Sequence, residues 1–64
     1  MERDSRKIIA RLLHEGWVEC GITGSHHHFK HANLPGKVTV PHPAKDLPRG
    51  TLNSIRKQAG WPKE

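Results

Sequence analysis

The sequence predicts an α+β domain in which a three-stranded antiparallel sheet carries two helices on one of its faces. Two segments, one near each end of the chain, have apolar residues at helical spacing. Between them lie three short segments of alternating apolar and polar residues, separated by turn signals. Only 33% of the residues are hydrophobic, which suits a thin core between one sheet face and two helices. We expect the chain, residues 1–64, to form a single domain.

The first element is expected to be a helix over residues 5–15. Its apolar side chains recur at the spacing of one helix face, at Ile8, Ile9, Leu12 and Leu13. Asp4 or Ser5 can cap the first turn with a side-chain oxygen. Gly16 can end the helix, because glycine readily adopts the left-handed conformation found after helix C-termini.

Three strands are expected next, over residues 17–22, 25–31 and 37–40. In the first strand Val18, Cys20 and Ile22 alternate against Trp17, Glu19 and Gly21. We therefore expect Cys20 to be a small buried residue. Thr23 and Gly24 form a plausible tight turn, which makes the first two strands a hairpin.

The third strand should turn Val38 and Val40 inward, and it ends where Pro41 and Pro43 remove backbone donors. A second helix is expected from Pro48 onward, with apolar residues on one face at Leu52, Ile55 and Ala59 and a stop at Gly60. This order of elements resembles a double-stranded-RNA-binding domain.

The composition favours a nucleic acid as the partner. Lys and Arg number 11 and Asp and Glu number 6, which gives a formal net charge of +5, and such an excess attracts polyanions. No run of apolar residues is long enough to span a membrane, and the first residues lack the apolar region of a signal peptide. The single cysteine excludes an internal disulfide, so a cytoplasmic location is expected.

The middle strand contains the most informative residues. Phe29 is its only large apolar residue, so the face that carries Phe29 should be the core face. Ser25, His27 and His31 share that face by alternation. The opposite, open face should carry His26, His28 and Lys30, with Lys37 from the next strand beside them.

A surface of histidines and lysines suits cleavage of RNA. RNA supplies its own nucleophile, the 2′-hydroxyl, so the enzyme needs a base, a cation and an acid. Imidazole can serve as base or acid near neutral pH, and lysine supplies the cation. The expected products are a 2′,3′-cyclic phosphate and a 5′-hydroxyl, formed without a metal or another cofactor.

Several other interpretations of the histidines remain open. The run of three histidines cannot easily bind one metal ion, because adjacent strand residues point to opposite faces. His26 and His28, which share a face, could still hold two corners of a metal site. The domain could also bind RNA without cleaving it, or dock an acidic protein partner. Elsewhere, His14 can simply favour the helix dipole, while His31 and His42 could orient loops or contact phosphate, although surface positions are favoured for both.

Four blocks of the sequence resemble the HicA (YcfA-like) toxins: residues 24–31 (GSHHHFKH), 36–43 (GKVTVPHP), 46–52 (DLPRGTL) and 55–60 (IRKQAG). The resemblance implies the toxin of a type II toxin–antitoxin pair with a double-stranded-RNA-binding-like fold. Such a toxin is an mRNA interferase, an endoribonuclease that cleaves mRNA without ribosomes. Its implied partner is a HicB-like antitoxin that covers the active site.

The resemblance also assigns roles to residues. The functional histidine of the family follows the Gly-Ser pair, which corresponds to His26, with His27 as the weaker candidate. His28 is the nearest candidate to assist it as a second catalytic residue. The expected RNA-binding residues are Gly24, Ser25, Lys30, Lys37, Arg49, Arg56 and Lys57.

Overall fold

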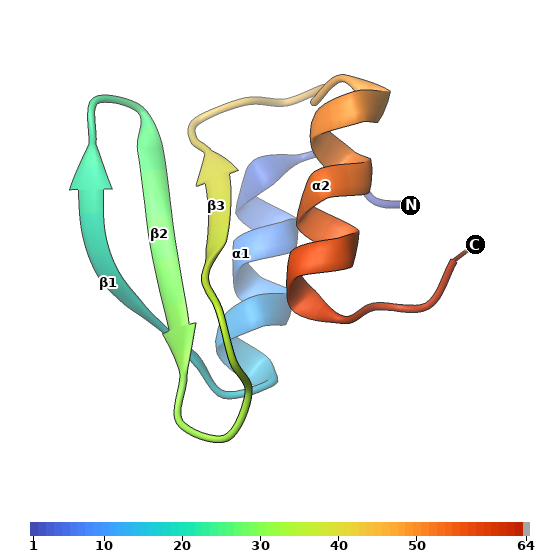
Figure 1. Ribbon diagram of the computed structural model, residues 1–64. Helices are drawn as coiled ribbons and strands as arrows, with labels where there is room; N and C mark the ends of the chain where they lie inside the picture. The colour runs from blue at the N-terminus through green and yellow to red at the C-terminus, as the bar shows by residue number, and fades with distance from the viewer. Residues whose placement is uncertain (64) are drawn as a thin grey trace.

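The computed structural model describes residues 1–63 and has the predicted architecture, with two helices and a three-stranded antiparallel sheet (Figure 1). Residue 64, the last of the predicted domain, lies outside the described residues. The elements are α1 (Ser5–His14), β1 (Trp17–Thr23), β2 (His26–His31), β3 (Val38–Pro41) and α2 (Arg49–Ala59). The predicted order of helix, three strands and helix is thus confirmed.

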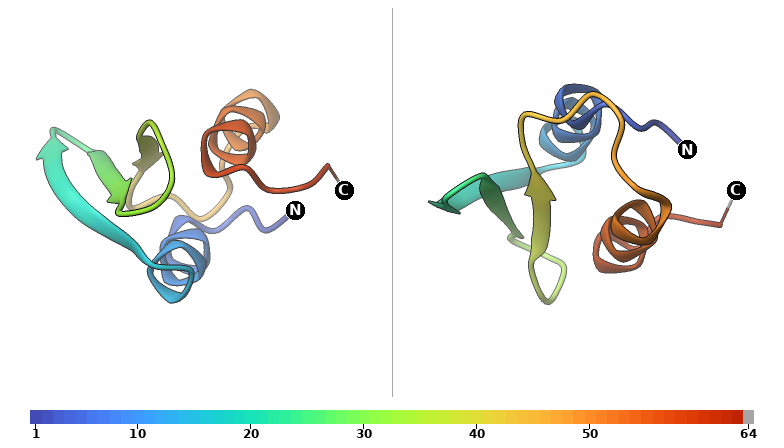
Figure 2. Two further views of the ribbon diagram at one scale, coloured as in Figure 1. Left: turned by 60° about the horizontal axis from the view of Figure 1, so that its bottom comes forward. Right: turned by 90° about the horizontal axis from the view of Figure 1, so that it is seen from above.

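The two helices lie on the same side of the sheet, and the opposite sheet face carries no helix (Figure 2). Both helices run in the same direction, from the top of Figure 1 to the bottom. β2 is the central strand, paired with β1 on one side and with β3 on the other. The chain between β3 and α2 passes over one end of the helical layer, close to the beginning of α1 (Figure 2).

Helix α1 begins where the sequence predicts and ends one residue earlier than predicted, at His14. The Asp4 side chain accepts a hydrogen bond of 2.9 Å from the backbone N–H of Arg6, and this bond holds the pKa of Asp4 below its ordinary value. The helix stops before Gly16, whose φ is +96°. A Cβ at Gly16 would lie 2.9 Å from Nε2 of His31, so this turn requires glycine for two reasons.

His31 holds the turn after α1 in place and is half-buried, which matches the alternative that it orients a loop. Its Nε2 donates a hydrogen bond of 2.9 Å to the Glu15 carbonyl, and the backbone N–H of Asn33 donates one of 3.0 Å to its Nδ1. These bonds link the end of α1 to the end of β2 and to the loop that follows it. His31 is therefore explained by its structural role.

Strand β1 departs from the predicted alternation. Glu19 pairs with Phe29 and Gly21 pairs with His28, so Cys20 is an extra residue between them and forms a β-bulge. Cys20 is exposed, and the prediction that it is buried was wrong. The buried apolar side chain of β1 is that of Trp17, whereas Val18 and Ile22 are exposed.

The core lies between the sheet and both helices. α1 contributes Ile8 and Leu12, and α2 contributes Leu52, Ile55 and Ala59, as predicted. The sheet side of the core is formed by Trp17, Phe29, Val38 and Val40, and the flanking segments add Leu47 and Trp61. The predicted inward faces of β2, β3 and both helices are confirmed.

Trp61 closes the end of the core against Glu15. Its Nε1 donates a hydrogen bond of 2.6 Å to Oε1 of Glu15, while Arg11 donates to the other carboxylate oxygen at 3.0 Å. The Arg11 guanidinium also lies 3.9 Å from the centre of the Trp61 ring. Burial raises the pKa of Glu15, but the bonds from Trp61 and Arg11 outweigh it and hold that pKa below its ordinary value.

Candidate active site

The histidines of β2 are divided between the two faces of the sheet. His27 pairs with Val40, and Phe29 pairs with Val38; both partners are buried, so this is the face that the helices cover. His26 and His28 alternate with them and lie on the open face. The predicted separation of His27 from its two neighbours is therefore present in the fold.

On the open face, His28 is fixed by two threonines. Its Nδ1 is hydrogen bonded to Oγ1 of Thr39 at 3.0 Å, and its Nε2 lies 3.3 Å from Oγ1 of Thr23. His26 is exposed, and residues 1–63 supply no hydrogen-bond or ion-pair partner for its ring. Lys30 is exposed on the same face, while Lys37 lies just before β3 and outside the ladder.

On the helix-covered face, His27 is paired with a carboxylate. Its Nδ1 lies 2.6 Å from Oε1 of Glu19, and the two side chains are 19% and 42% exposed. Glu19 reaches this face because it pairs with Phe29 just before the bulge at Cys20. The carboxylate accepts the Nδ1–H, so Nε2 is the nitrogen of His27 that can accept or donate a proton.

A second histidine lies against His27. The rings of His27 and His42 have centroids 5.0 Å apart and planes at 86°. Nδ1 of His42 is hydrogen bonded to Oγ of Ser5 at 2.7 Å, and the backbone N–H of His42 donates to the Ser25 carbonyl at 2.8 Å. His42 is half-buried, and its contacts match the alternative that it orients a loop.

Ser5 connects this histidine to the beginning of α1. Its side chain is fully buried, and its Oγ also accepts a hydrogen bond of 2.9 Å from the backbone N–H of Ala44. In return, the backbone N–H of Ser5 donates to the Ala44 carbonyl at 2.8 Å. The segment after β3 is thus tied to α1, and His42 is held beside His27.

These contacts define a histidine pair, which consists of His27 and His42 with their supports Glu19 and Ser5. Both Nδ1 atoms are hydrogen bonded to the supports, which leaves both Nε2 atoms for proton transfer. Two imidazoles in contact can act on two atoms of one substrate group. The arrangement therefore has the components of an acid–base site.

The family of the chain follows from its sequence match. A family model described as the HicA toxin of bacterial toxin–antitoxin systems matches residues 5–61. The chain belongs to the HicA toxin family. Members of this family are generally mRNA interferases, and membership of a toxin–antitoxin system implies an antitoxin partner. No curated protein matches the chain.

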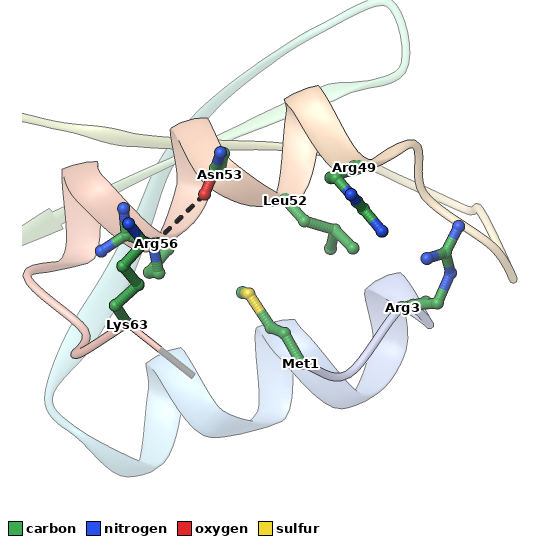
Figure 3. A pocket seen from close by; sticks show the side chains of 7 residues that line it. All are labelled: Met1, Arg3, Arg49, Leu52, Asn53, Arg56 and Lys63. Atoms are coloured by element: carbon green, nitrogen blue, oxygen red, sulfur yellow. Dashed lines mark hydrogen bonds between the residues drawn. The ribbon is translucent and has the colours of Figure 1, made fainter.

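The cationic residues predicted to bind RNA do not form one continuous surface. Lys30 and Lys37 are on the sheet side, while Arg49 and Arg56 line a cavity of about 410 Å³ beside α2 (Figure 3). Met1, Arg3, Leu52, Asn53 and Lys63 also line it. Lys57 is exposed on α2 and does not line the cavity.

The arginines around the cavity are partly engaged within the toxin. Arg3 forms an ion pair with Asp46, and Arg56 donates hydrogen bonds to Oδ1 of Asn53 and to the Trp61 carbonyl, each at 3.3 Å. In Figure 3 the α2 residues face the N-terminal segment across the cavity. The histidine pair is not part of this lining.

Two further structural findings concern residues 1–63 of the toxin. No group of three or more His, Cys, Asp or Glu side chains there has the arrangement of a metal site. None of the helices described is long and apolar enough to cross a membrane.

The sequence reasoning missed three members of the site, namely Glu19, His42 and Ser5. One usable signal was Trp17: taking this large apolar residue as the inward one would have placed Glu19 on the same face. The contacts of His42 and Ser5 could not be found in this way, because they join residues 37 positions apart through a segment without regular structure.

Proposed function

We propose that this HicA toxin is a metal-independent endoribonuclease that cleaves mRNA, with His27 as the general base. The observation that supports this most strongly is the contact of 2.6 Å between Nδ1 of His27 and the Glu19 carboxylate. A carboxylate in this position fixes the tautomer and orientation of an imidazole and stabilises the imidazolium that forms when Nε2 takes a proton. Within residues 1–63, neither His26 nor His28 has a carboxylate partner.

This proposal differs from the sequence prediction in its choice among the three adjacent histidines. His26, the residue that the family resemblance favoured, is exposed and has no partner in residues 1–63 that would orient its ring. His28 is oriented, but both of its nitrogens are already within hydrogen-bonding distance of threonine hydroxyls. His27 combines a fixed Nδ1 with an unoccupied Nε2, and its side chain is 19% exposed.

The reaction is transesterification within the RNA. Nε2 of His27 takes the proton of a 2′-hydroxyl, and the oxygen attacks the adjacent phosphorus. The bond from phosphorus to the 5′-oxygen breaks, which leaves a 2′,3′-cyclic phosphate and, once the departing oxygen is protonated, a 5′-hydroxyl. A positioned base contributes about 10²- to 10⁴-fold to such a rate.

The RNA backbone is proposed to contact basic side chains on the sheet side and on α2, together with the turn that precedes β2. The residues in this proposal are Gly24, Ser25, Lys30, Lys37, Arg49, Arg56 and Lys57. A HicB-like antitoxin is proposed to inhibit the enzyme by covering the histidines. The net charge of +5 supports an RNA substrate, because each phosphate contact releases counterions.

The test is cleavage of an RNA transcript by the purified toxin and by single His→Gln variants at positions 26, 27 and 28. We expect His27→Gln to lose about 10²- to 10⁴-fold in rate, while His14→Gln, an exposed change at the end of α1, serves as the matched control. If His26→Gln lost cleavage activity and His27→Gln kept it in full, the general base would instead be His26 on the open face.

Glu19 is proposed to position His27 rather than to touch RNA. Glu19→Gln should therefore lower kcat and leave KM unchanged, whereas a residue that binds RNA should change KM. Cleavage that disappears with EDTA would favour a metal mechanism. Salt-dependent RNA binding without any product would instead favour a non-catalytic RNA-binding module.

A further inference from the structure

We infer that His42 is the general acid of the reaction and that Ser5 is the residue that positions it. This inference rests on the proposed ribonuclease activity, because it assigns the second proton transfer of that reaction. A base alone leaves the departing 5′-oxygen without a proton donor. A second titratable side chain must therefore lie close to the first, on the same side of the sheet.

His42 meets this requirement through its contact with His27. The two ring centroids are 5.0 Å apart, and both Nδ1 atoms are occupied by supports within the toxin. The attacking and departing oxygens belong to one phosphorus, so a base and an acid that serve both must be neighbours. By contrast, His26 and His28 lie on the other face of the sheet.

Ser5 can hold His42 in either protonation state. Its Oγ accepts the Ala44 N–H at 2.9 Å and lies 2.7 Å from Nδ1 of His42. The hydroxyl accepts Nδ1–H when the ring is protonated, and it still accepts Nδ1–H after Nε2 has given up its proton, because that neutral ring keeps its hydrogen on Nδ1. Because Ser5 is fully buried, its Oγ stays fixed while His42 gains or loses a proton.

The backbone of His42 is also fixed relative to the turn before β2. Its N–H donates to the Ser25 carbonyl at 2.8 Å, which attaches the end of β3 to the turn between β1 and β2. Side chain and backbone are thus anchored to two different elements. This double attachment distinguishes His42 from His14, which is exposed on α1.

The proton balance of the step is complete. His27 begins neutral and His42 begins protonated. Nε2 of His27 takes the 2′-hydroxyl proton as the new bond to phosphorus forms, and Nε2 of His42 gives its proton to the 5′-oxygen as the old bond breaks. Exchange with water then restores both rings, and no oxidant, reductant or metal is consumed.

A substrate with a sulfur leaving group separates the two roles. In an RNA oligonucleotide with a 5′-bridging phosphorothiolate at the mapped cleavage site, the departing thiolate needs no proton donor. His42→Gln should lose at least about 10²-fold on the ordinary RNA and recover on the phosphorothiolate RNA. His27→Gln should be impaired on both, because the 2′-hydroxyl still needs a base.

Ser5→Ala should behave as a weaker version of His42→Gln. Its rate on ordinary RNA should fall, and the ratio of phosphorothiolate cleavage to ordinary cleavage should rise. A merely structural effect of Ser5 would lower both rates equally and leave this ratio unchanged. Because one preparation cuts both substrates, the ratio does not depend on the fraction of folded protein.

Each other outcome contradicts the inference in a recognisable way. Full cleavage of ordinary RNA by His42→Gln, or equal loss on both substrates, would overturn the role of His42 and leave the ribonuclease proposal standing. A wild-type toxin that cuts neither substrate would overturn both proposals together. His14→Gln, measured in parallel, should match the wild type on both substrates.

Discussion

Replacing Ser5 with alanine removes one buried oxygen atom that serves two hydrogen bonds. The Ala44 N–H loses its acceptor at 2.9 Å, and Nδ1 of His42 loses its partner at 2.7 Å. An unsatisfied buried polar group costs about 1–3 kcal/mol. The cost at His42 is at the lower end, because that residue is half-buried and water can reach it.

The expected change in the free energy of unfolding is a loss of about 2 kcal/mol, after an offset of about 0.5 kcal/mol because alanine is the better helix former. For a domain of this size, this corresponds to a fall in Tm of about 8–16 °C. In urea, where m is about 1 kcal/mol/M for a small domain, the midpoint should fall by about 2 M. Both quantities can be measured by circular dichroism.

Ser54→Ala is the matched control, because Ser54 is exposed on α2 and should change stability by less than about 0.5 kcal/mol. If Ser5→Ala proves as stable as this control, the two hydrogen bonds do not hold the segment after β3 against α1. The positioning role that we assign to Ser5 would then lose its physical basis as well.

Two further predictions concern stability. Because the pKa of Glu15 is lowered in the folded state, its contribution to stability is present above its unfolded pKa of about 4.3 and is lost as the pH falls through the folded value. Glu15→Gln should therefore destabilise at pH 7 and match the wild type at strongly acidic pH in urea unfolding; an equal difference at both pH values would contradict this. Gly16→Ala should cost about 1–3 kcal/mol, because φ is +96° and the new Cβ would lie 2.9 Å from the His31 ring. The control is Gly21→Ala, because no atom lies within 4 Å of its added Cβ. Equal Tm values for the two variants in thermal unfolding would refute the argument.

The helices and the central strand could be predicted from the sequence because their apolar residues repeat at a clear period. Phe29 alone was sufficient to assign the faces of β2, and Leu52 and Ile55 were sufficient to orient α2. These predictions depend on local pattern, and local pattern determines which side of an element is buried.

The alternation of β1 could not be predicted, because one extra residue changes the face of everything beyond it. The bulge at Cys20 puts Ile22 on the same face as His27, and Ile22 is 57% exposed there. An uninterrupted alternation requires all three of Val18, Cys20 and Ile22 to share one face. A strand at the edge of the sheet tolerates this irregularity, since only β2 constrains its register.

The candidate site was only partly predictable for a related reason. A pattern in one strand indicates which face a histidine occupies, but it does not indicate what meets that face from another element. The histidine pair depends on α1, β1, β2 and the segment after β3, and Ser5 supports it from inside the core. One buried hydroxyl thus both joins the two layers and orients a side chain of the candidate site. Changes at Ser5 should accordingly affect stability and cleavage together, whereas changes at Glu19, which is 42% exposed in its side chain, should affect cleavage with little loss of stability.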